Sequence, residues 1–138
     1  MLSRKGPQRT TRLTLRVAWR HVDFNLHMNY ASYLEAMEVG RWDWVARAGL
    51  IVPWLRNGLR PVVGSVDMHY RKELRPFARY TLETELVGFD RRAVVFTQRF
   101  LVGTALHAEG KINALIRSPR GLLTAQEMLD LLPEELRP

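Results

Sequence analysis

Apolar residues recur at helical spacing in one long stretch of this chain, directly after a group of short polar residues. At roughly 100° per residue they fall on one side of a helix that begins near Tyr30. That side carries Tyr30, Tyr33, Leu34, Met37, Trp44, Val45 and Ala48. Asn29 suits the N-cap because its side chain can accept from first-turn amides, and Gly49 suits the position after the last turn. The pattern predicts one long amphipathic helix.

One cation interrupts the apolar side of this helix. Arg41 falls in its middle, and a buried guanidinium is costly unless it is paired. Glu38 lies one turn earlier, so an ion pair between Glu38 and Arg41 is expected. Glu35 falls on the polar side and is kept as a second helix carboxylate to consider.

Alternating apolar and polar residues predict strands on both sides of the helix. Before it, the alternation from Arg12 to Trp19 indicates a half-buried strand with Trp19 on the apolar side. After a connection over residues 51–60, which contains Pro53 and Gly58, no second long helix follows. Four strand-like segments follow instead: Val62–Leu74, Arg79–Gly88, Ala93–Val102 and Ala105–Arg117. Their short connections favour antiparallel pairing.

A short helix is predicted near the end of the chain. Thr124 and Glu127 have the spacing of a capping box, leucines follow, and Pro133 closes the segment. The order is therefore strand, long helix, four antiparallel strands and short helix, which is an α+β fold. A single apolar-sided helix beside one antiparallel sheet is buried most simply if the sheet wraps around it.

Length and composition limit the domain organisation and the compartment. A chain of 138 residues with 46% hydrophobic residues predicts one folded domain, over residues 12–138, after a flexible basic arm over residues 1–11. The absence of cysteine excludes disulfides and thiolate chemistry and fits a reducing compartment, so a cytoplasmic protein is expected. No apolar run approaches the roughly 18 residues of a membrane span, so no membrane insertion is expected.

The formal net charge of +7 favours anionic partners. Nucleic acid, a membrane surface and a phosphate-bearing ligand all fit, and so does a merely solvated basic surface. The long helix is unlike a nucleic-acid recognition helix, because Glu35, Glu38 and Asp43 oppose Arg41 and Arg47 on it. No nucleic-acid partner is therefore expected, and a polyphosphate ligand is retained.

Candidate chemistry gathers immediately before the long helix. Asp23, Asn25, His27 and Asn29 lead into its N-terminus, where backbone amides and the helix dipole stabilise negative charge. A carboxylate that activates water, together with such amides, can hydrolyse an ester or thioester. A second interpretation is also open: Asp23 caps a turn, His27 holds the loop and Asn29 serves only as the N-cap.

Two pairs at alternate strand positions raise the possibility of a metal site. Asp67 with His69, and His107 with Glu109, each place both side chains on one strand face. Neither pair has a convincing third ligand, and exposed faces alternate in this way by default. No metal is expected.

The motif D-x-x-x-H-x-N over residues 23–29, with Tyr33-Leu34 and then Glu38-x-x-Arg41, resembles the signature of the hotdog-fold acyl-CoA thioesterases. The resemblance is to the 4-hydroxybenzoyl-CoA thioesterase-like group. The segment from Tyr70 to Phe77 is similar to the strand and turn that follow that family's helix. The resemblance covers about residues 12–117.

The resemblance implies a five-stranded antiparallel sheet around one helix, in a homodimer or homotetramer with the active site at the subunit interface. It implies that Asp23 is the catalytic carboxylate and that no prosthetic group is needed, coenzyme A being part of the substrate. Tyr30 stands where the family typically has a second asparagine. This difference bears on the acyl pocket rather than on the fold.

These observations together predict an acyl-CoA thioesterase. The expected catalytic residues are Asp23, His27 and Asn29. The expected substrate-binding residues are Tyr30, Tyr33, Ser65, Arg91 and Arg92, where Ser65 offers a hydroxyl from a neighbouring subunit and the arginines pair with phosphates. Further candidates for the phosphates are Arg71, Lys72, Arg75, Arg99 and Arg120. The alternative function is a non-catalytic acyl-CoA or lipid-binding module with the same pocket.

Overall fold

The structure is a computed structural model that describes residues 9–137. Its helices are α1 (Tyr30–Arg47), α2 (Ile51–Arg56) and α3 (Ala125–Leu131), with 3₁₀ turns at Trp19–His21 and Glu134–Leu136. Its strands are β1 (Thr10–Arg16), β2 (Arg60–Tyr70), β3 (Arg79–Asp90), β4 (Ala93–Val102), β5 (Ala105–Ser118) and β6 (Gly121–Leu122). None of the described helices is long and apolar enough to cross a membrane.

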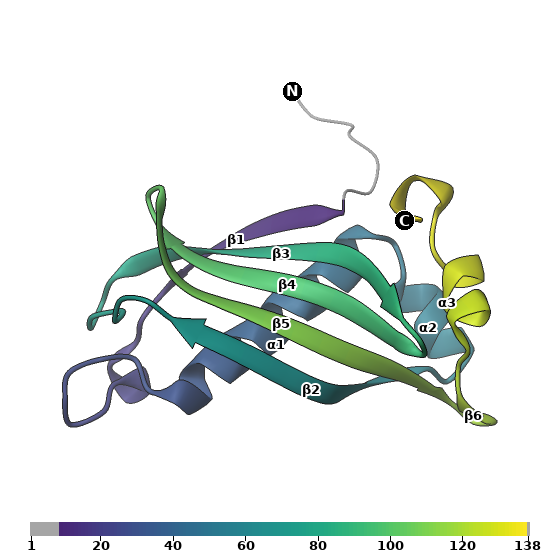
Figure 1. The fold of residues 1–138 in the computed structure, drawn as a ribbon, viewed down its shortest axis with the longest axis horizontal. Coiled ribbons are helices and arrows are strands. Elements are labelled where there is room, and N and C mark those ends of the chain that lie inside the picture. The colour runs from purple at the N-terminus through teal and green to yellow at the C-terminus, as the bar shows by residue number, and fades with distance from the viewer. Residues whose placement is uncertain (1–8, 138) are drawn as a thin grey trace.

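The strands form one antiparallel sheet in the order β1-β3-β4-β5-β2, and the short β6 pairs with β5 (Figure 1). Consecutive hairpins place β3, β4 and β5 side by side. β1 and β2 are the two outer strands of this order, with β1 on β3 and β2 on β5. The predicted five-stranded antiparallel sheet is confirmed, and β6 is a small addition to it.

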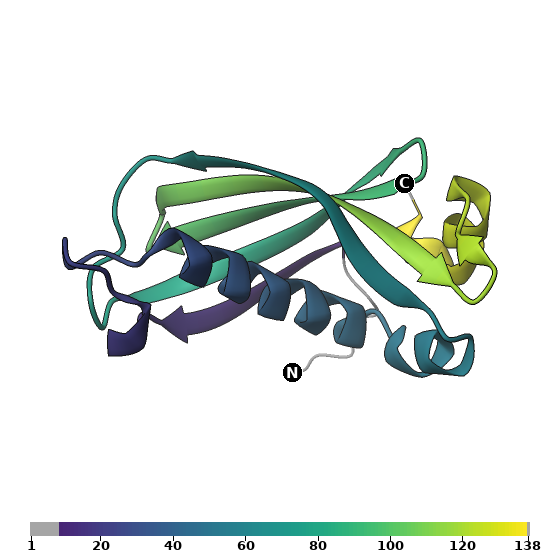
Figure 2. The same cartoon turned by 90° about the horizontal axis from the view of Figure 1, so that it is seen from below.

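α1 lies along one face of the curved sheet (Figure 2). Along β5, residues alternate so that Ala108, Ile112 and Ile116 are buried and face the interior. Gly40 allows α1 to approach β3, because a Cβ atom there would lie 2.7 Å from Leu82 Cδ2. The sheet therefore wraps around the helix, as the sequence predicts.

The other face of the sheet is polar. Arg99 on β4 bonds to Glu83, Glu85 and Glu109, which lie on its own strand's two neighbours, at 2.8 to 3.1 Å. These residues alternate with buried ones such as Phe100. The two faces follow from the period-two pattern of the strands.

α1 does not sit centrally under the sheet. It packs mainly against β1 and β3. The predicted apolar side is therefore buried only in part: Tyr33 and Met37 are in the core, whereas Tyr30 is 71% and Leu34 46% exposed. The exposed Tyr30 ring lies beside Tyr70 of β2, with ring centroids 4.9 Å apart.

Several boundaries differ from the sequence prediction. β1 begins at Thr10 rather than Arg12 and ends at Arg16, and Trp19 lies in the following 3₁₀ turn, 62% exposed rather than packed inside. Residues 1–8 of the predicted arm lie outside the described residues. β2 stops at Tyr70 because the amides of Arg71 and Lys72 both turn to the His107 carbonyl.

The connection after α1 is more regular than the sequence suggests. Residues Ile51–Arg56 form α2, whose third residue is Pro53. Proline is tolerated there because first-turn amides have no intrahelical acceptor. Gly49 adopts φ 75°, as predicted for the residue after a helix, and the Thr124–Glu127 capping box begins α3.

Candidate active site

The loop that leads into α1 is held by its own aspartate. Asp23 Oδ1 accepts from the amides of Asn25 at 2.9 Å and His27 at 3.3 Å, and the Asp23 amide donates to the His27 carbonyl at 3.0 Å. Leu26 at the tip takes φ 59° to close the turn. The capping role of Asp23 is thus present in the structure, and it fixes the carboxylate at the entrance to α1.

The first turn of α1 is only partly satisfied. Asn29 Oδ1 accepts from the Ser32 amide at 2.9 Å, which confirms Asn29 as the N-cap. Within the described part of the chain, the amides of Tyr30 and Ala31 have no acceptor. Two N–H groups at the positive end of the helix dipole therefore remain to bind an oxyanion.

The two histidines near this loop have different surroundings. His21 Nδ1 accepts from the Ala18 amide at 3.1 Å, and the His21 carbonyl accepts from Asn29 at 2.7 Å. His27 contributes its backbone to the turn, and its ring is half-buried. His21 is therefore a positioning residue for the loop, while the His27 ring remains a candidate for substrate contact.

An aromatic cluster lies beside the N-terminus of α1. The ring centroids of Tyr30 and Tyr70 are 4.9 Å apart, those of Tyr33 and Tyr70 5.1 Å, and those of Tyr33 and Phe100 4.9 Å. Burial raises the pKa of Tyr33 to about 12, so its hydroxyl is neutral at physiological pH. Tyr33 lies beneath the surface, and Tyr30 and Tyr70 form the accessible part.

Tyr70 is a member of this cluster that was not predicted from the sequence. The sequence does place Tyr70 two and four residues after Met68 and Val66. Alternate residues of a strand share a face, so all three lie on the inner face of β2, toward α1. The register puts Tyr70 opposite Ala108, whose lack of bulk leaves room for the ring.

Basic residues lie near the Asp23 loop, and they belong to the predicted phosphate candidates, although Arg91 and Arg92 are not among them. The Met28 amide donates to the Leu74 carbonyl at 2.8 Å, which joins the loop to the segment after β2. That segment carries Arg71, Lys72 and Arg75, all exposed. The same segment also carries the exposed acidic residue Glu73.

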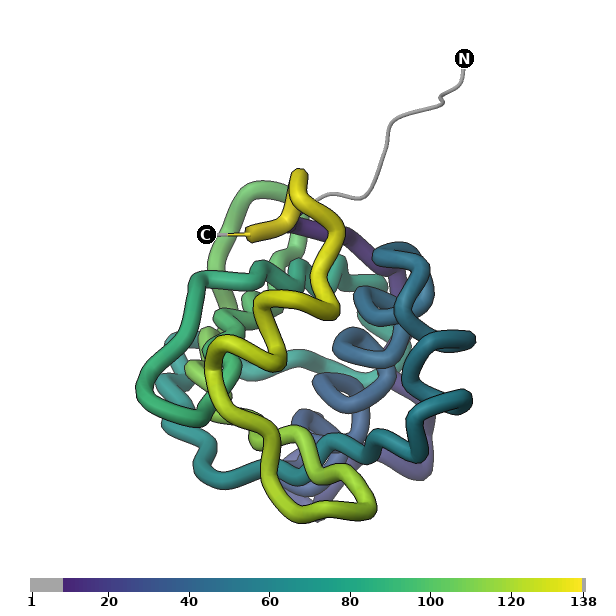
Figure 3. Tube along the Cα trace, turned by 90° about the vertical axis from the view of Figure 1, so that its right-hand side faces the viewer, coloured from purple at the N-terminus to yellow at the C-terminus, as the bar shows by residue number. Residues whose placement is uncertain are grey.

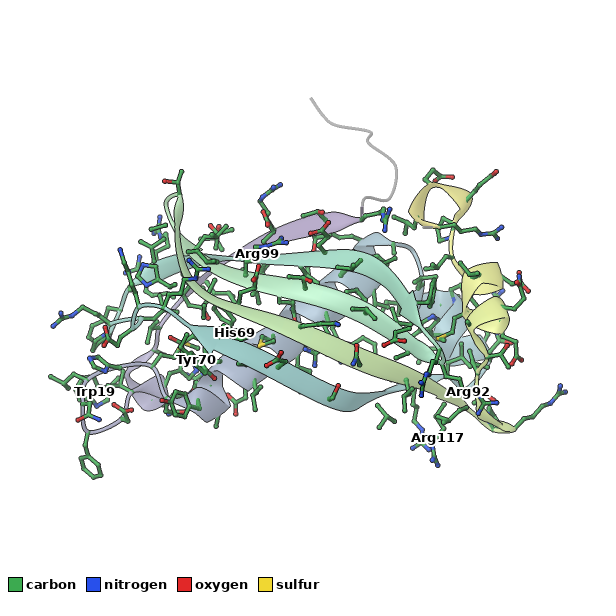
Figure 4. The ribbon with its side chains drawn as sticks, viewed as in Figure 1. Trp19, His69, Tyr70, Arg92, Arg99 and Arg117 are labelled. Carbon is green, nitrogen blue, oxygen red and sulfur yellow. The ribbon has the colours of Figure 1, made fainter. Side chains whose placement is uncertain are left out.

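Arg91 and Arg92 lie at the opposite end of the molecule. They form the turn between β3 and β4, where Arg91 takes φ 57°. Figure 4 shows Arg92 at one end of the sheet, and Trp19, just before the Asp23 loop, at the other. Within one chain, the predicted phosphate-binding arginines do not join Asp23, because the β3 strand carries the chain away from that end.

Ser65 also lies apart from the Asp23 loop in the same chain. Its hydroxyl accepts from Asn113 Nδ2 at 2.9 Å on the polar outer face of β2. A register shift between Val63 and Ser65 reverses the side that the alternation would otherwise give. The predicted contact with a thioester is not formed within one chain.

Arg41 has a different partner from the one predicted. Its Nη1 donates to Gln98 Oε1 at 2.9 Å, and no oxygen of Glu38 lies within 4.0 Å of its nitrogens. Gln98 is fully buried and donates in turn to the Met37 carbonyl and Thr84 Oγ1, both at 2.9 Å. A neutral amide, rather than a carboxylate, thus fixes the guanidinium.

Of the two pairs considered as metal ligands, only Asp67 and His69 lie close to each other. His69 Nε2 lies 3.6 Å from Asp67 Oδ2, both exposed on β2, while Glu109 bonds to Arg99. Among residues 9–137, no three His, Asp or Glu side chains are grouped closely enough to hold a metal ion.

Comparison with known proteins gives the family. The model of the thioesterase-like superfamily matches residues 17–124. The chain belongs to this superfamily. Protein THEM6 of Danio rerio is 28% identical over 119 residues, covering 85% of this chain and 57% of that protein. Protein THEM6 of Drosophila melanogaster is 26% identical over 113 residues, covering 80% of this chain and 56% of that protein. The chain spans about half the length of these curated relatives.

Solved structures confirm the hotdog fold. YbaW, a probable thioesterase from Escherichia coli, has a TM-score of 0.78 at 19% identity, covering 88% of this chain and 97% of that one. A mutant 4-hydroxybenzoyl-CoA thioesterase complexed with 4-hydroxybenzoyl-CoA also has a TM-score of 0.78, at 11% identity, covering 91% of this chain and all of that one. The resemblance drawn from the 23–41 motif is therefore confirmed for family and fold.

Proposed function

We propose that this chain hydrolyses acyl-CoA thioesters. The observation that carries the proposal is the position of the Asp23 carboxylate, fixed by its own loop beside a helix N-terminus with two amides to spare. Membership of the thioesterase-like superfamily supports a thioester substrate. A structural neighbour complexed with 4-hydroxybenzoyl-CoA supports a CoA ester in particular.

In the proposed reaction, the thioester carbonyl oxygen lies against the amides of Tyr30 and Ala31. Asp23 removes a proton from water, whose oxygen adds to the carbonyl carbon, and the amides stabilise the oxyanion that forms. The intermediate then expels the CoA thiolate, which takes up a proton. In the alternative route, Asp23 attacks the carbon itself and water hydrolyses the resulting anhydride. Either route consumes one water and yields a carboxylic acid and a thiol.

The proposed active form is a homodimer that pairs β2 edges. β2 is an outer strand of the sheet, so its free edge is available for pairing, and its inner face carries Val63, Val66 and Tyr70, all at least one-third exposed. The exposed Tyr30 ring of α1 lies beside Tyr70 and adds to this apolar surface. A second copy carries the same apolar residues and the same β2 edge. Two-fold pairing therefore buries the apolar residues of both copies and hydrogen-bonds both β2 edges.

This dimer also accommodates the predicted arginines. Antiparallel pairing of two β2 strands reverses the second copy, so its Arg91 and Arg92 approach the Asp23 end of the first. We assign the CoA phosphates to Arg71, Lys72 and Arg75 of one chain together with Arg91 and Arg92 of the other. Guanidinium groups suit this task because they pair bidentately with phosphate.

The test is thiol release from short, long and aromatic acyl-CoA esters. Wild type is expected to release thiol and Asp23→Asn to lose the activity while still binding substrate. Asp43→Asn is the matched control, since Asp43 lies in the second half of α1, away from Asp23, and pairs with Arg47. If wild type binds acyl-CoA but releases no thiol from any ester, the chain is a non-catalytic binding module. The engagement of Asp23 Oδ1 by its own loop is the observation that favours this second function.

A further inference from the structure

A cavity of about 250 Å³ lies at the end of α1 farthest from Asp23. The second half of α1, the end of the sheet, α2 and α3 surround it, and Figure 3 shows α3 lying across this end of the molecule. Its walls are mainly apolar and include Trp42, Trp54, Val63, Phe96, Met128 and Leu132.

This cavity is separate from the candidate active site of the same chain. Arg41 of α1 lines the cavity, and α1 begins at Tyr30, next to the Asp23 loop. At about 1.5 Å per residue, the two positions are roughly 16 Å apart along the helix axis. No residue of the Asp23 loop lines the cavity.

One cation lies in the cavity wall. Arg41 is half-buried there, and Glu38, the other charged residue of the lining, is exposed. Burial lowers the pKa of the Arg41 guanidinium, and the charge of Glu38 opposes that effect. Because a guanidinium has five N–H donors and the described residues supply only Gln98 as a side-chain acceptor, donors remain for a ligand.

Arg99 shows what a satisfied arginine looks like in the same sheet. It bonds to three carboxylates on the outer face. Arg41 is instead oriented by a neutral, fully buried amide that is itself fixed by Met37 and Thr84. A positioned cation without a bonded anion, in an apolar enclosure, is complementary to a ligand with one negative charge.

We infer that this cavity binds a small free carboxylic acid, with its carboxylate on Arg41 and its apolar body among the tryptophans. The size is suitable, because an apolar cavity of roughly 150 Å³ already admits benzene. The planar carboxylate matches the fork of a guanidinium, whereas a phosphate ester would bring a second charge that one arginine leaves unpaired. The inference stands apart from the proposed hydrolysis, although such an acid is also the product of that reaction.

Octanoate and benzoate are the probes, with octanol as the neutral analogue of octanoate. Binding is followed by the fluorescence of Trp42, Trp44 and Trp54, which line the cavity, and by calorimetry on the full chain. Octanoate is expected to bind wild type, and Arg41→Met to weaken octanoate at least about tenfold while leaving octanol unchanged. Arg47→Met is the matched control, since Arg47 lies on the same helix but pairs with Asp43 at 3.0 Å.

A second variant covers the case in which Arg41→Met does not fold. Ala114→Leu places extra volume in the cavity from β5 and is expected to weaken octanoate and octanol together. The inference is overturned if wild type binds no octanoate, or if Arg41→Met weakens neither ligand. It is also overturned if Asp23→Asn abolishes octanoate binding, because the acid then sits at the proposed hydrolytic site. Loss of hydrolysis in Asp23→Asn with octanoate binding intact separates this site from the proposed active site.

Discussion

The two ends of α1 face different surroundings. At its N-terminus the helix opens onto an exposed loop with a fixed carboxylate, spare amides and nearby cations. At its C-terminal half, α2, α3 and the sheet enclose an apolar cavity with one inward cation. The helix dipole accounts for part of this difference, since its positive end favours developing negative charge. The remainder depends on how far each end is surrounded by protein. The N-terminal end of α1, called the open end below, has room for a large CoA ester. The C-terminal end, called the closed end, has room for a small apolar ligand.

Removing Trp44 tests the closed end and has the largest expected effect. Trp44 is 2% exposed, packs edge-on against Phe96 at 5.2 Å, and donates from Nε1 to the Arg9 carbonyl at 2.9 Å. Trp44→Ala is expected to lower the free energy of unfolding by about 3–5 kcal/mol, because it leaves a void beside an existing cavity. Urea unfolding measures this change. Trp42→Ala, at a half-exposed position on the same helix, is the control and is expected to lose much less.

Replacing Tyr30 by proline tests the open end. Proline at the first helical position preserves the helix and removes only one amide, and Asn29 already has the extended backbone that precedes proline, with ψ 160°. Tyr30→Pro is expected to lower kcat about 10²–10³-fold relative to Tyr30→Ala, the usual loss for one oxyanion donor. Tyr30→Ala removes the same ring, so equal kcat values for the two variants would exclude the Tyr30 amide as a donor.

Alkaline pH probes the buried tyrosines near the N-terminus of α1. Burial raises the pKa of Tyr33 and of Tyr80 to about 12. The unfolded chain ionises its tyrosines near pH 10 and the folded chain does not, so their contribution is complete below pH 10 and is lost as pH rises to 12. The loss is on the order of 2 kcal/mol for each tyrosine. Unfolding at stepped pH measures it, and Tyr33→Phe should flatten the slope; an unchanged slope would contradict the assignment.

The sequence predicts the fold well because its signals are local. Alternation gives β4 from Ala93 to Val102 without error, and the Thr124–Glu127 spacing gives the start of α3. The predicted position of Trp19 on the apolar side of the first strand is wrong, because alternation does not indicate where a strand leaves the sheet. β2 ends before the predicted Leu74 for a similar reason, since the amides of Arg71 and Lys72 bond to the His107 carbonyl of β5, far along the chain.

The candidate site is less predictable than the fold because it depends on which elements meet. The Asp23 motif and the Asn29 cap are contiguous and are read directly. Arg41 and Gln98 are 57 residues apart, and their contact depends on the register of β4 against α1. Arg91 and Arg92 have suitable chemistry but lie at the far end of a long strand, which charge alone does not reveal.

The caps of α1 and α3 give the smallest and most closely matched comparison. The Asn29 side chain accepts from the Ser32 amide at the start of α1, which is the open end. The Thr124 side chain accepts from the Glu127 amide at the start of α3, which forms a wall of the cavity. Asn29→Ala and Thr124→Ala are each expected to lower the free energy of unfolding by about 1 kcal/mol, because each removes the side-chain acceptor of a first-turn amide. Their functional effects should diverge: Asn29→Ala is expected to reduce thiol release, since it loosens the helix start that carries the oxyanion amides. Thr124→Ala is expected to spare thiol release and to weaken octanoate, since α3 forms a wall of the cavity. If both variants change both readouts equally, the two ends of α1 act as one site.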